Sequence, residues 1–300
     1  MPGLTLCLRR AALLPILCAS ALVAAKAKED HGLRFDDPRV LDLASWTLKF
    51  DAGKALAFGK LDAATALAIM KAPAISEETP LQLPFSEDQF DCKDDAACMK
   101  AHEAKLIAQA DGSVRRIDKR LVIAGAGQPV ILADWVQPQA PNAEGEHETH
   151  WYLGRMAGNG YHRVEVQFGH DAPGDFLINS KNGKVAFVHN GADIVRLSAD
   201  GKYVFTFNTL NPPLTLRVAR LDDSGPALVL MCQARARDDK TSGEFRDWSS
   251  ANAFDFIVHV GGVAQDQDVQ LRLTHGDGGW SGAASDADKL TAAGFVCKAL

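Results

Sequence analysis

The densest group of metal-competent side chains in the sequence contains two histidines with a glutamate between them. These residues are His147, Glu148 and His150. A zinc-binding helix of the metalloprotease type needs two histidines four residues apart, so that both imidazoles point the same way. The spacing here is three, the flanking segment contains proline and glycine, and in a strand the two imidazoles would face opposite sides. We therefore expect a solvated polar loop at this position.

A metal site in this part of the chain would need further ligands after folding. His162, His170 and Asp171 follow the histidine pair and carry suitable donor atoms. The sequence therefore leaves one catalytic alternative open, a secreted metal-assisted hydrolase that uses the region from His147 to Asp171.

A serine near the C-terminus partly matches the turn that presents the nucleophile of α/β-hydrolases. Gly279 lies two residues before Ser281, but Ala283 stands where that turn needs a second glycine. The acidic groups Asp266–Asp268 and Asp277 lack the spaced ligands of a calcium loop. We expect turns at all these positions, and we assign no catalytic, cofactor-binding or metal-binding residue.

Four tryptophans fall in or beside predicted strands: Trp135, Trp151, Trp248 and Trp280. An exposed pair could contact a sugar or a protein, because tryptophan combines a large contact area with a polar N–H group. Tryptophan is highly buried on average, however. We therefore expect these side chains to pack in the core or at the rim of a sheet.

Four of the six cysteines lie beyond the first 27 residues: Cys92, Cys98, Cys232 and Cys297. An even number in an exported chain indicates disulfides. Closeness in sequence favours Cys92–Cys98, which leaves Cys232–Cys297. The second bridge would tie the C-terminus back to the β portion and, by its long loop, contribute about 4 kcal/mol in the chain-entropy model. Zinc is the alternative, but five residues between Cys92 and Cys98 do not match the usual ligand spacing.

We expect the chain to be built around the segment from Tyr161 to Leu221, because strand and turn signals alternate along it. Asn182-Gly183 and Asp200-Gly201 separate apolar runs. Both pairs tolerate the positive φ that tight hairpin turns require. A further turn signal spans Asp222 to Gly225. The pattern predicts an antiparallel meander.

One of these turns resembles a known repeat. Residues 198–205, Ser-Ala-Asp-Gly-Lys-Tyr-Val-Phe, resemble the Ser-Pro-Asp-Gly hairpin of the periplasmic TolB-type β-propeller, with Ala199 in place of the proline. The resemblance covers residues 194–232. It implies a binding or scaffolding role in the cell envelope and carries over no catalytic residue.

The number of strand signals limits the architecture. Propellers have at least four blades of four strands each. About a dozen strand signals are spaced along this sequence as in sandwich or propeller-type sheets. We therefore expect a β-sandwich or incomplete propeller-like sheets in place of a closed propeller.

The part of the chain before the meander is alanine-rich and predicts helices. Asp62 is a suitable N-cap for a helix over Ala63–Lys71, and a second helix is predicted over Ala96–Ala110. Asp37-Pro38 predicts a third, short helix, because aspartate and proline favour the N-cap and the first helical position.

The first 27 residues predict a secretory signal peptide. Arg9 and Arg10 precede an uncharged run over 11–25, and Ala25 and Ala27 supply the small residues of a cleavage site. The run is too short to cross a bilayer comfortably, although an uncleaved anchor is the alternative. No later segment reaches transmembrane length. Cleavage removes three basic residues and no acid, so the net charge falls from −6 to −9. An acidic chain is a poor candidate for binding nucleic acid or an anionic membrane.

Together these patterns predict a mainly β protein with a small α+β portion at 28–112 and an antiparallel β-rich domain at 113–300. We expect it to be periplasmic or secreted, and to bind an envelope or extracellular protein.

Overall fold

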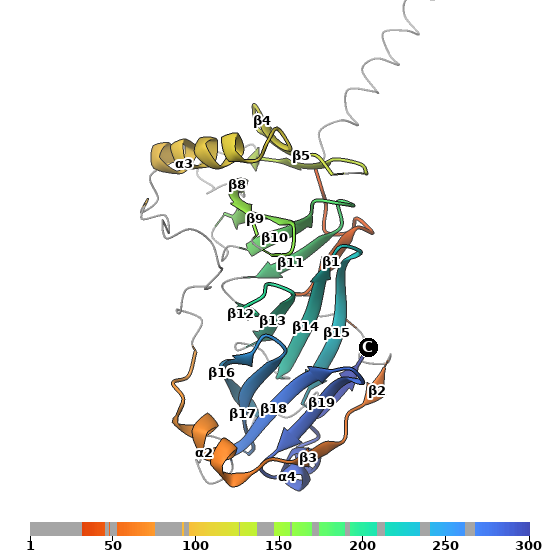
Figure 1. Cartoon of the computed structure of the whole chain (residues 1–300). Coiled ribbons are helices and arrows are strands. Elements are labelled where there is room, and N and C mark those ends of the chain that lie inside the picture. Colours follow the sequence, from red (N-terminus) through yellow and green to blue (C-terminus); the bar gives the residue numbers. More distant parts are fainter. Residues whose placement is uncertain are drawn as a thin grey trace, which may run out of the picture.

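The computed structural model describes most of the chain after residue 31. The described residues are 32–45, 48, 53–75, 92, 96–125, 127–136, 147–156, 158–169, 174–189, 193–208, 214–234, 241–261 and 268–300. Strands dominate among them and form four mostly antiparallel sheets that do not close into a barrel (Figure 1). The predicted mainly β, antiparallel fold class is therefore confirmed.

Two of the sheets belong to the first half of the β-rich region. Sheet A contains, in spatial order, β1 (Val40–Asp42), β11 (Val185–His189), β10 (Gly174–Asn179), β9 (Tyr161–Phe168), β8 (His147–Arg155) and β7 (Trp135–Val136). Sheet D contains β4 (Val114–Ile117), β5 (Arg120–Ile123) and β6 (Val130–Ala133).

The other two sheets come mainly from the second half. Sheet B contains, in order, β12 (Asp193–Leu197), β13 (Tyr203–Asn208), β14 (Thr215–Asp222), β15 (Gly225–Gln233), β20 (Val296–Ala299) and β2 (Lys54–Ala55). Sheet C contains β16 (Ser242–Ser250), β17 (Ala253–His259), β18 (Asp268–Gly276), β19 (Gly279–Ala284) and β3 (Phe58–Lys60).

The four sheets stack face to face in the order D, A, B, C (Figure 1). One apolar cluster joins sheets D and A, a second joins A and B, and a third joins B and C. Sheets A and B therefore bury both faces, and β10 and β13 are buried at every position. A strand buried on one face alternates apolar and polar residues. These strands are buried on both faces, which explains their continuous apolar runs.

The N-terminal part of the described chain runs along the edges of this stack. β1, β2 and β3 add one edge strand each to sheets A, B and C. The structure does not clearly show a small α+β portion at 28–112 as a unit of its own. The proposed domain boundary at residue 112 stays a prediction.

The short helix predicted from Asp37-Pro38 is wrong. The Asp37 carboxylate accepts hydrogen bonds from the Arg39 backbone N–H at 2.8 Å and from its guanidinium. This local turn leads directly into β1, which pairs in parallel with β11. Backbone pairing to a buried strand thus outweighs a helix-start signal in a segment too short to hold a helix by itself.

The other predicted helices are present as α2 (Ala63–Lys71) and α3 (Ala96–Gln109), and a third helix is α4 (Ala287–Ala292). The N-cap of α2 is Asp62, which accepts a hydrogen bond from the Thr65 backbone N–H at 2.9 Å, as the sequence predicts. Ile69 of α2 packs on sheet C. None of the helices among the described residues combines the length and the apolar character needed to cross a membrane.

Both predicted disulfides are confirmed. Cys92 pairs with Cys98, at the beginning of α3. Cys232 pairs with Cys297 between two strands in register, β15 and β20. The two cysteines of the second bridge are 65 residues apart in sequence, and the bridge fastens the C-terminal strand β20 to sheet B.

The segment around Ser281 is a strand, and the predicted turn is wrong. It forms β19, which pairs with β18 along its whole length. Trp280 is buried in the core between sheets B and C, and Ser281 is exposed. A buried tryptophan and six backbone pairings outweigh the turn preference of the neighbouring glycines.

Candidate binding site

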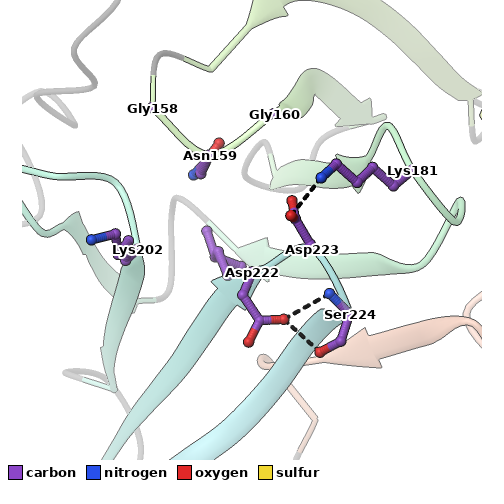
Figure 2. A pocket seen from close by; sticks show the side chains of 9 residues that line it. Gly158, Asn159, Gly160, Lys181, Lys202, Asp222, Asp223 and Ser224 are labelled. Carbon is purple, nitrogen blue, oxygen red and sulfur yellow. Dashed lines mark hydrogen bonds and ion pairs between the residues drawn. The ribbon is translucent and has the colours of Figure 1, made fainter.

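Hairpin turns from sheets A and B meet at one end of the stack and enclose a pocket of about 710 Å³ (Figure 2). We call its lining the turn surface, and its residues are Gly158, Asn159, Gly160, Lys181, Lys202, Leu221, Asp222, Asp223 and Ser224. They come from the connections β8–β9, β10–β11, β12–β13 and β14–β15. Every second connection of an antiparallel meander lies at the same end, so these four turns are brought together by the topology.

The sequence of each turn explains its local shape. Gly183 and Gly201 adopt φ of +69°, and Gly225 adopts +108°, values that glycine tolerates best. The Asp200 carboxylate accepts hydrogen bonds from the Ser198 hydroxyl and from the Lys202 backbone N–H. The turns at Asn182-Gly183 and Asp200-Gly201 were predicted from the sequence, and the structure has both.

Hydrogen bonds between the two sheets hold the turns against one another. The Tyr161 hydroxyl and the Asn179 amide both donate to the Asp222 carbonyl oxygen, at 3.0 and 2.6 Å. The Asn159 amide donates to the Gly201 carbonyl oxygen at 2.5 Å. Because Tyr161 and Asn179 belong to sheet A and Asp222 to sheet B, the relative position of the turns is fixed before anything binds.

The two lysines of the turn surface form ion pairs, one with Asp223 of the lining and one with the half-buried Asp200 beside it. Lys181 Nζ lies 2.5 Å from Asp223 Oδ2, and Lys202 Nζ lies 3.2 Å from Asp200 Oδ2. Figure 2 shows Lys181 and Lys202 on opposite sides of Asp222. Exposed pairs of this kind contribute little to stability, so their side chains are available to exchange partners with a ligand.

Two carboxylates, Asp222 of the turn surface and Asp200 beside it, are held ionised. Burial raises the pKa of Asp222, but hydrogen bonds from Ser224 and the charge of Arg220 outweigh burial, so the pKa lies below its ordinary value. The same holds for Asp200, whose pKa is lowered by Ser198 and Lys202 against the effect of burial. These groups are acceptors at neutral pH and do not act as proton donors. The arrangement suits binding through hydrogen bonds and ion pairs.

The histidine pair of the sequence analysis lies in β8, and the predicted solvated loop is wrong. His150 is only 1% exposed. Its Nδ1 lies 3.1 Å from Asp134 Oδ1 and its Nε2 lies 3.0 Å from Glu148 Oε1. Burial lowers the pKa of His150, but these two carboxylates outweigh burial and raise the pKa above its ordinary value. His147 is half-buried at the start of the strand.

His150 belongs to a larger group that we call the buried network, made of Glu103, Arg116, Asp134, Glu148 and His150. Glu103 on α3 accepts hydrogen bonds from Arg116 Nε and Nη2 and from the Tyr152 backbone N–H. Arg116 also donates to Asp134 Oδ2 at 3.0 Å and to the His150 carbonyl oxygen at 2.5 Å. The network joins α3 and sheet D to sheet A, so it has a structural role.

The remaining candidate ligands do not join this group. His162 lies on β9 four residues from Val166, the partner of His150, which separates the two histidines by about 13 Å along the strand. His170 and Asp171 lie outside the described residues. In the described part of the chain, three or more histidine, cysteine, aspartate or glutamate side chains nowhere gather closely enough to hold a metal ion.

The tryptophans divide between core and surface. Trp280 and Trp248 pack in the cluster between sheets B and C, with Trp248 at its rim. Trp151 is half-buried, and Trp135 is 47% exposed. Core or rim packing therefore describes Trp280 and Trp248, whereas Trp135 lies on the surface.

Sequence reasoning placed the turns but did not assign them to a site. Asn159, Lys181 and Lys202 resemble ordinary solvated turn residues when each turn is considered alone. The signal that could have found them is the alternation itself, because turns two connections apart in a meander share one end. The inter-sheet contacts of Asn159 and Asn179 have no local signature.

Comparison of the chain with protein-family models, with curated proteins and with solved structures gives no match. The resemblance of residues 194–232 to a TolB-type repeat therefore stays a prediction.

Proposed function

We propose that this chain is an exported interaction protein of the cell envelope that binds another protein through the turn surface and catalyses no reaction. The observation that carries the proposal is the convergence of four turns from two rigid sheets on one open, charged pocket. Binding residues in proteins are often placed on loops that a rigid scaffold positions.

The chemistry of the turn surface favours a protein ligand. Pockets for small apolar molecules are lined mainly by hydrophobic and aromatic side chains. The lining here contains two lysines, two aspartates, an asparagine and a serine, with Leu221 as its one large apolar residue. A polypeptide loop offers backbone donors, carbonyl acceptors and charges of both signs, which complement such a lining.

The predicted export of the chain supports a partner outside the cytoplasm. The N-terminal sequence predicts a signal peptide, and both disulfides join the cysteines that remain after its removal. Structural disulfides persist in oxidising compartments such as the periplasm. The partner is therefore expected in the envelope or outside the cell.

Affinity capture with charge-reversed variants tests this function. The mature protein is immobilised and exposed to envelope extract, in parallel with Lys202→Glu, with Asp223→Lys and with the control Lys289→Glu on α4. We expect the wild type and the control to retain the same partner, and each turn variant to retain it at least about tenfold less, as when charges at an interface are reversed.

Two outcomes would contradict the proposal. One is a partner retained equally by all four proteins, since the turn surface would then not be the binding site. The other is the absence of any saturable partner from extracts of envelope and culture medium.

A further inference from the structure

A second, smaller cavity lies between α3 and the end of β8, apart from the turn surface. It measures about 260 Å³, below the roughly 300–1,000 Å³ of pockets for drug-sized ligands. Leu106, Gln109 and Ala110 line it from the α3 side, and residues 152–155 line it from β8. It lies on the other side of the β8–β9 hairpin from the turn surface, because Tyr161 faces sheet B and Tyr152 faces sheet D.

A β-bulge shapes the β8 wall. The pairing of β8 with β9 shifts register between Tyr152 and Gly154, and Gly154 adopts φ of +106°. After the bulge Arg155 pairs with His162, so these two side chains leave the sheet on the same face. The Tyr152 hydroxyl lies 2.9 Å from His162 Nδ1, which places it on that face as well. Bulges commonly re-aim side chains in this manner beside binding sites.

The tyrosine–histidine pair has one hydrogen-bond donor too many. His162 is fully buried, and burial together with the charge of Arg155 lowers its pKa to about 4, so the ring is neutral at pH 7. A neutral imidazole has one N–H, and the tyrosine has one O–H. If Tyr152 donates to Nδ1, the proton on Nε2 is left over; if Nδ1–H donates to Tyr152, the hydroxyl proton is left over. His162 Nε2 has no hydrogen-bond partner.

The guanidinium of Arg155 lies beside the Tyr152–His162 pair. The Arg155 side chain is exposed and forms no ion pair with any residue that the structure describes. Arg155 pairs directly with His162 across the two strands and lines the same cavity as Tyr152, so it lies beside the pair. A buried donor without an acceptor is costly. A planar guanidinium beside it matches the geometry of a carboxylate.

We propose that this cavity binds a small organic carboxylate. The Arg155 guanidinium pairs with the carboxylate. Tyr152 lines the cavity, and when His162 Nδ1–H donates to the tyrosine oxygen, the Tyr152 hydroxyl proton is the one that donates to a carboxylate oxygen. Leu106 and Ala110 contact a short apolar tail. This inference concerns a different face of the hairpin and does not depend on the proposed function.

Titration of the purified mature protein with butyrate tests the site, with butyramide as the uncharged analogue and inorganic phosphate as a second anion. Binding is followed by calorimetry and by the ring nitrogen signals of His162. We expect saturable binding of butyrate, a changed Nε2 signal, and much weaker binding of butyramide and phosphate.

Variants locate the ligand. Arg155→Gln is expected to weaken butyrate binding by at least about tenfold, and Tyr152→Phe by less, as expected for lost hydrogen bonds to a charged group. Arg115→Gln removes another exposed arginine, from the outer face of sheet D, and is the matched control. Thermal unfolding of each variant shows whether it is folded, and the exposed Arg155 is not expected to affect folding.

Three results would overturn the proposal. They are no saturable butyrate binding to the wild type, equal binding of butyramide, and an Arg155→Gln variant that binds as the wild type does. Tighter binding of phosphate than of butyrate would also overturn it, because the site would then not be one for carboxylates.

Discussion

The turn surface and the buried network both contain acid–base pairs, but the two regions are built differently. In the turn surface the partners are exposed: Lys181 and Asp223 keep 61% and 70% of their side-chain surface in water. In the buried network Glu103 keeps 7% and His150 keeps 1%. Water screens the first region and leaves its charges exchangeable, whereas in the second the buried Glu103 and His150 must be satisfied within the protein. The turn surface is therefore suited to binding, and the buried network to holding sheet D and α3 in place.

The largest expected effect is the loss of the central acceptor of the buried network. Glu103→Ala removes the partner of two Arg116 nitrogens and of the buried Tyr152 backbone N–H. We expect the free energy of unfolding in urea to fall by about 3 kcal/mol, as for buried charged groups that lose their partner. The control Asp223→Ala removes an exposed carboxylate and should change it by less than about 0.5 kcal/mol. Similar losses in the two variants would remove the distinction between the regions.

The second effect concerns the backbone of the turn surface. Gly183→Ala places a side chain at φ of +69° and brings its Cβ to 3.0 Å from the Gln128 carbonyl oxygen. Gly112, with φ of +74°, has open space around the same position and is the matched control. We expect Gly112→Ala to cost about 1 kcal/mol of unfolding free energy and Gly183→Ala more, because it adds a close contact to the unfavourable φ. Equal losses would show that the turn can shift freely.

The two regions also differ in how well they can be predicted from the sequence. Turn chemistry is local, so Asn182-Gly183 and Asp200-Gly201 could be placed correctly, as could α2 from its Asp62 cap. The buried network could not, because Glu103 meets the Tyr152 backbone 49 residues later and Arg116 meets Asp134 18 residues later. Neither contact leaves a pattern at fixed spacing.

The strands show the same division. β16 was not predicted, since Phe245 is its only fully buried residue among polar neighbours. The polar residues of β16 are held in a strand by pairing with β17, which has an apolar run of its own. Strands that carry their own hydrophobic pattern can be predicted from the sequence, and strands that depend on a neighbour cannot.

A third prediction separates the regions by pH. The raised pKa of His150 means that the folded state binds its proton more tightly than the unfolded chain. The stability from this group is fully present below the unfolded pKa of about 6.5 and is lost as the pH rises through the raised value. His162 acts in the opposite direction, because its lowered pKa stabilises the fold above pH 6.5 and that stability is lost as the pH falls toward 4.

Because the two histidines oppose each other, the informative quantity is the difference between wild type and His150→Gln. Unfolding free energies measured in urea from pH 5 to 9 should give a wild-type advantage that is largest at the acid end and declines as the pH rises. A difference that does not change with pH would mean that the pKa of His150 is the same in the folded and unfolded chain, and a wild-type advantage that shrinks toward acid pH would mean that folding lowers it.

The smallest expected effect is the coupling between Lys181 and Asp223. A double-mutant cycle with Lys181→Ala and Asp223→Ala should give an interaction energy below about 0.5 kcal/mol in unfolding, since both side chains must be ordered and both remain in water. The same cycle measured on partner binding should give a larger value, because an interface that covers the pair also excludes the water that screens it. A large coupling in unfolding would mean that the pair holds the turns together, as Glu103 and Arg116 hold α3. The charges of the turn surface would then not be free to exchange partners with a ligand.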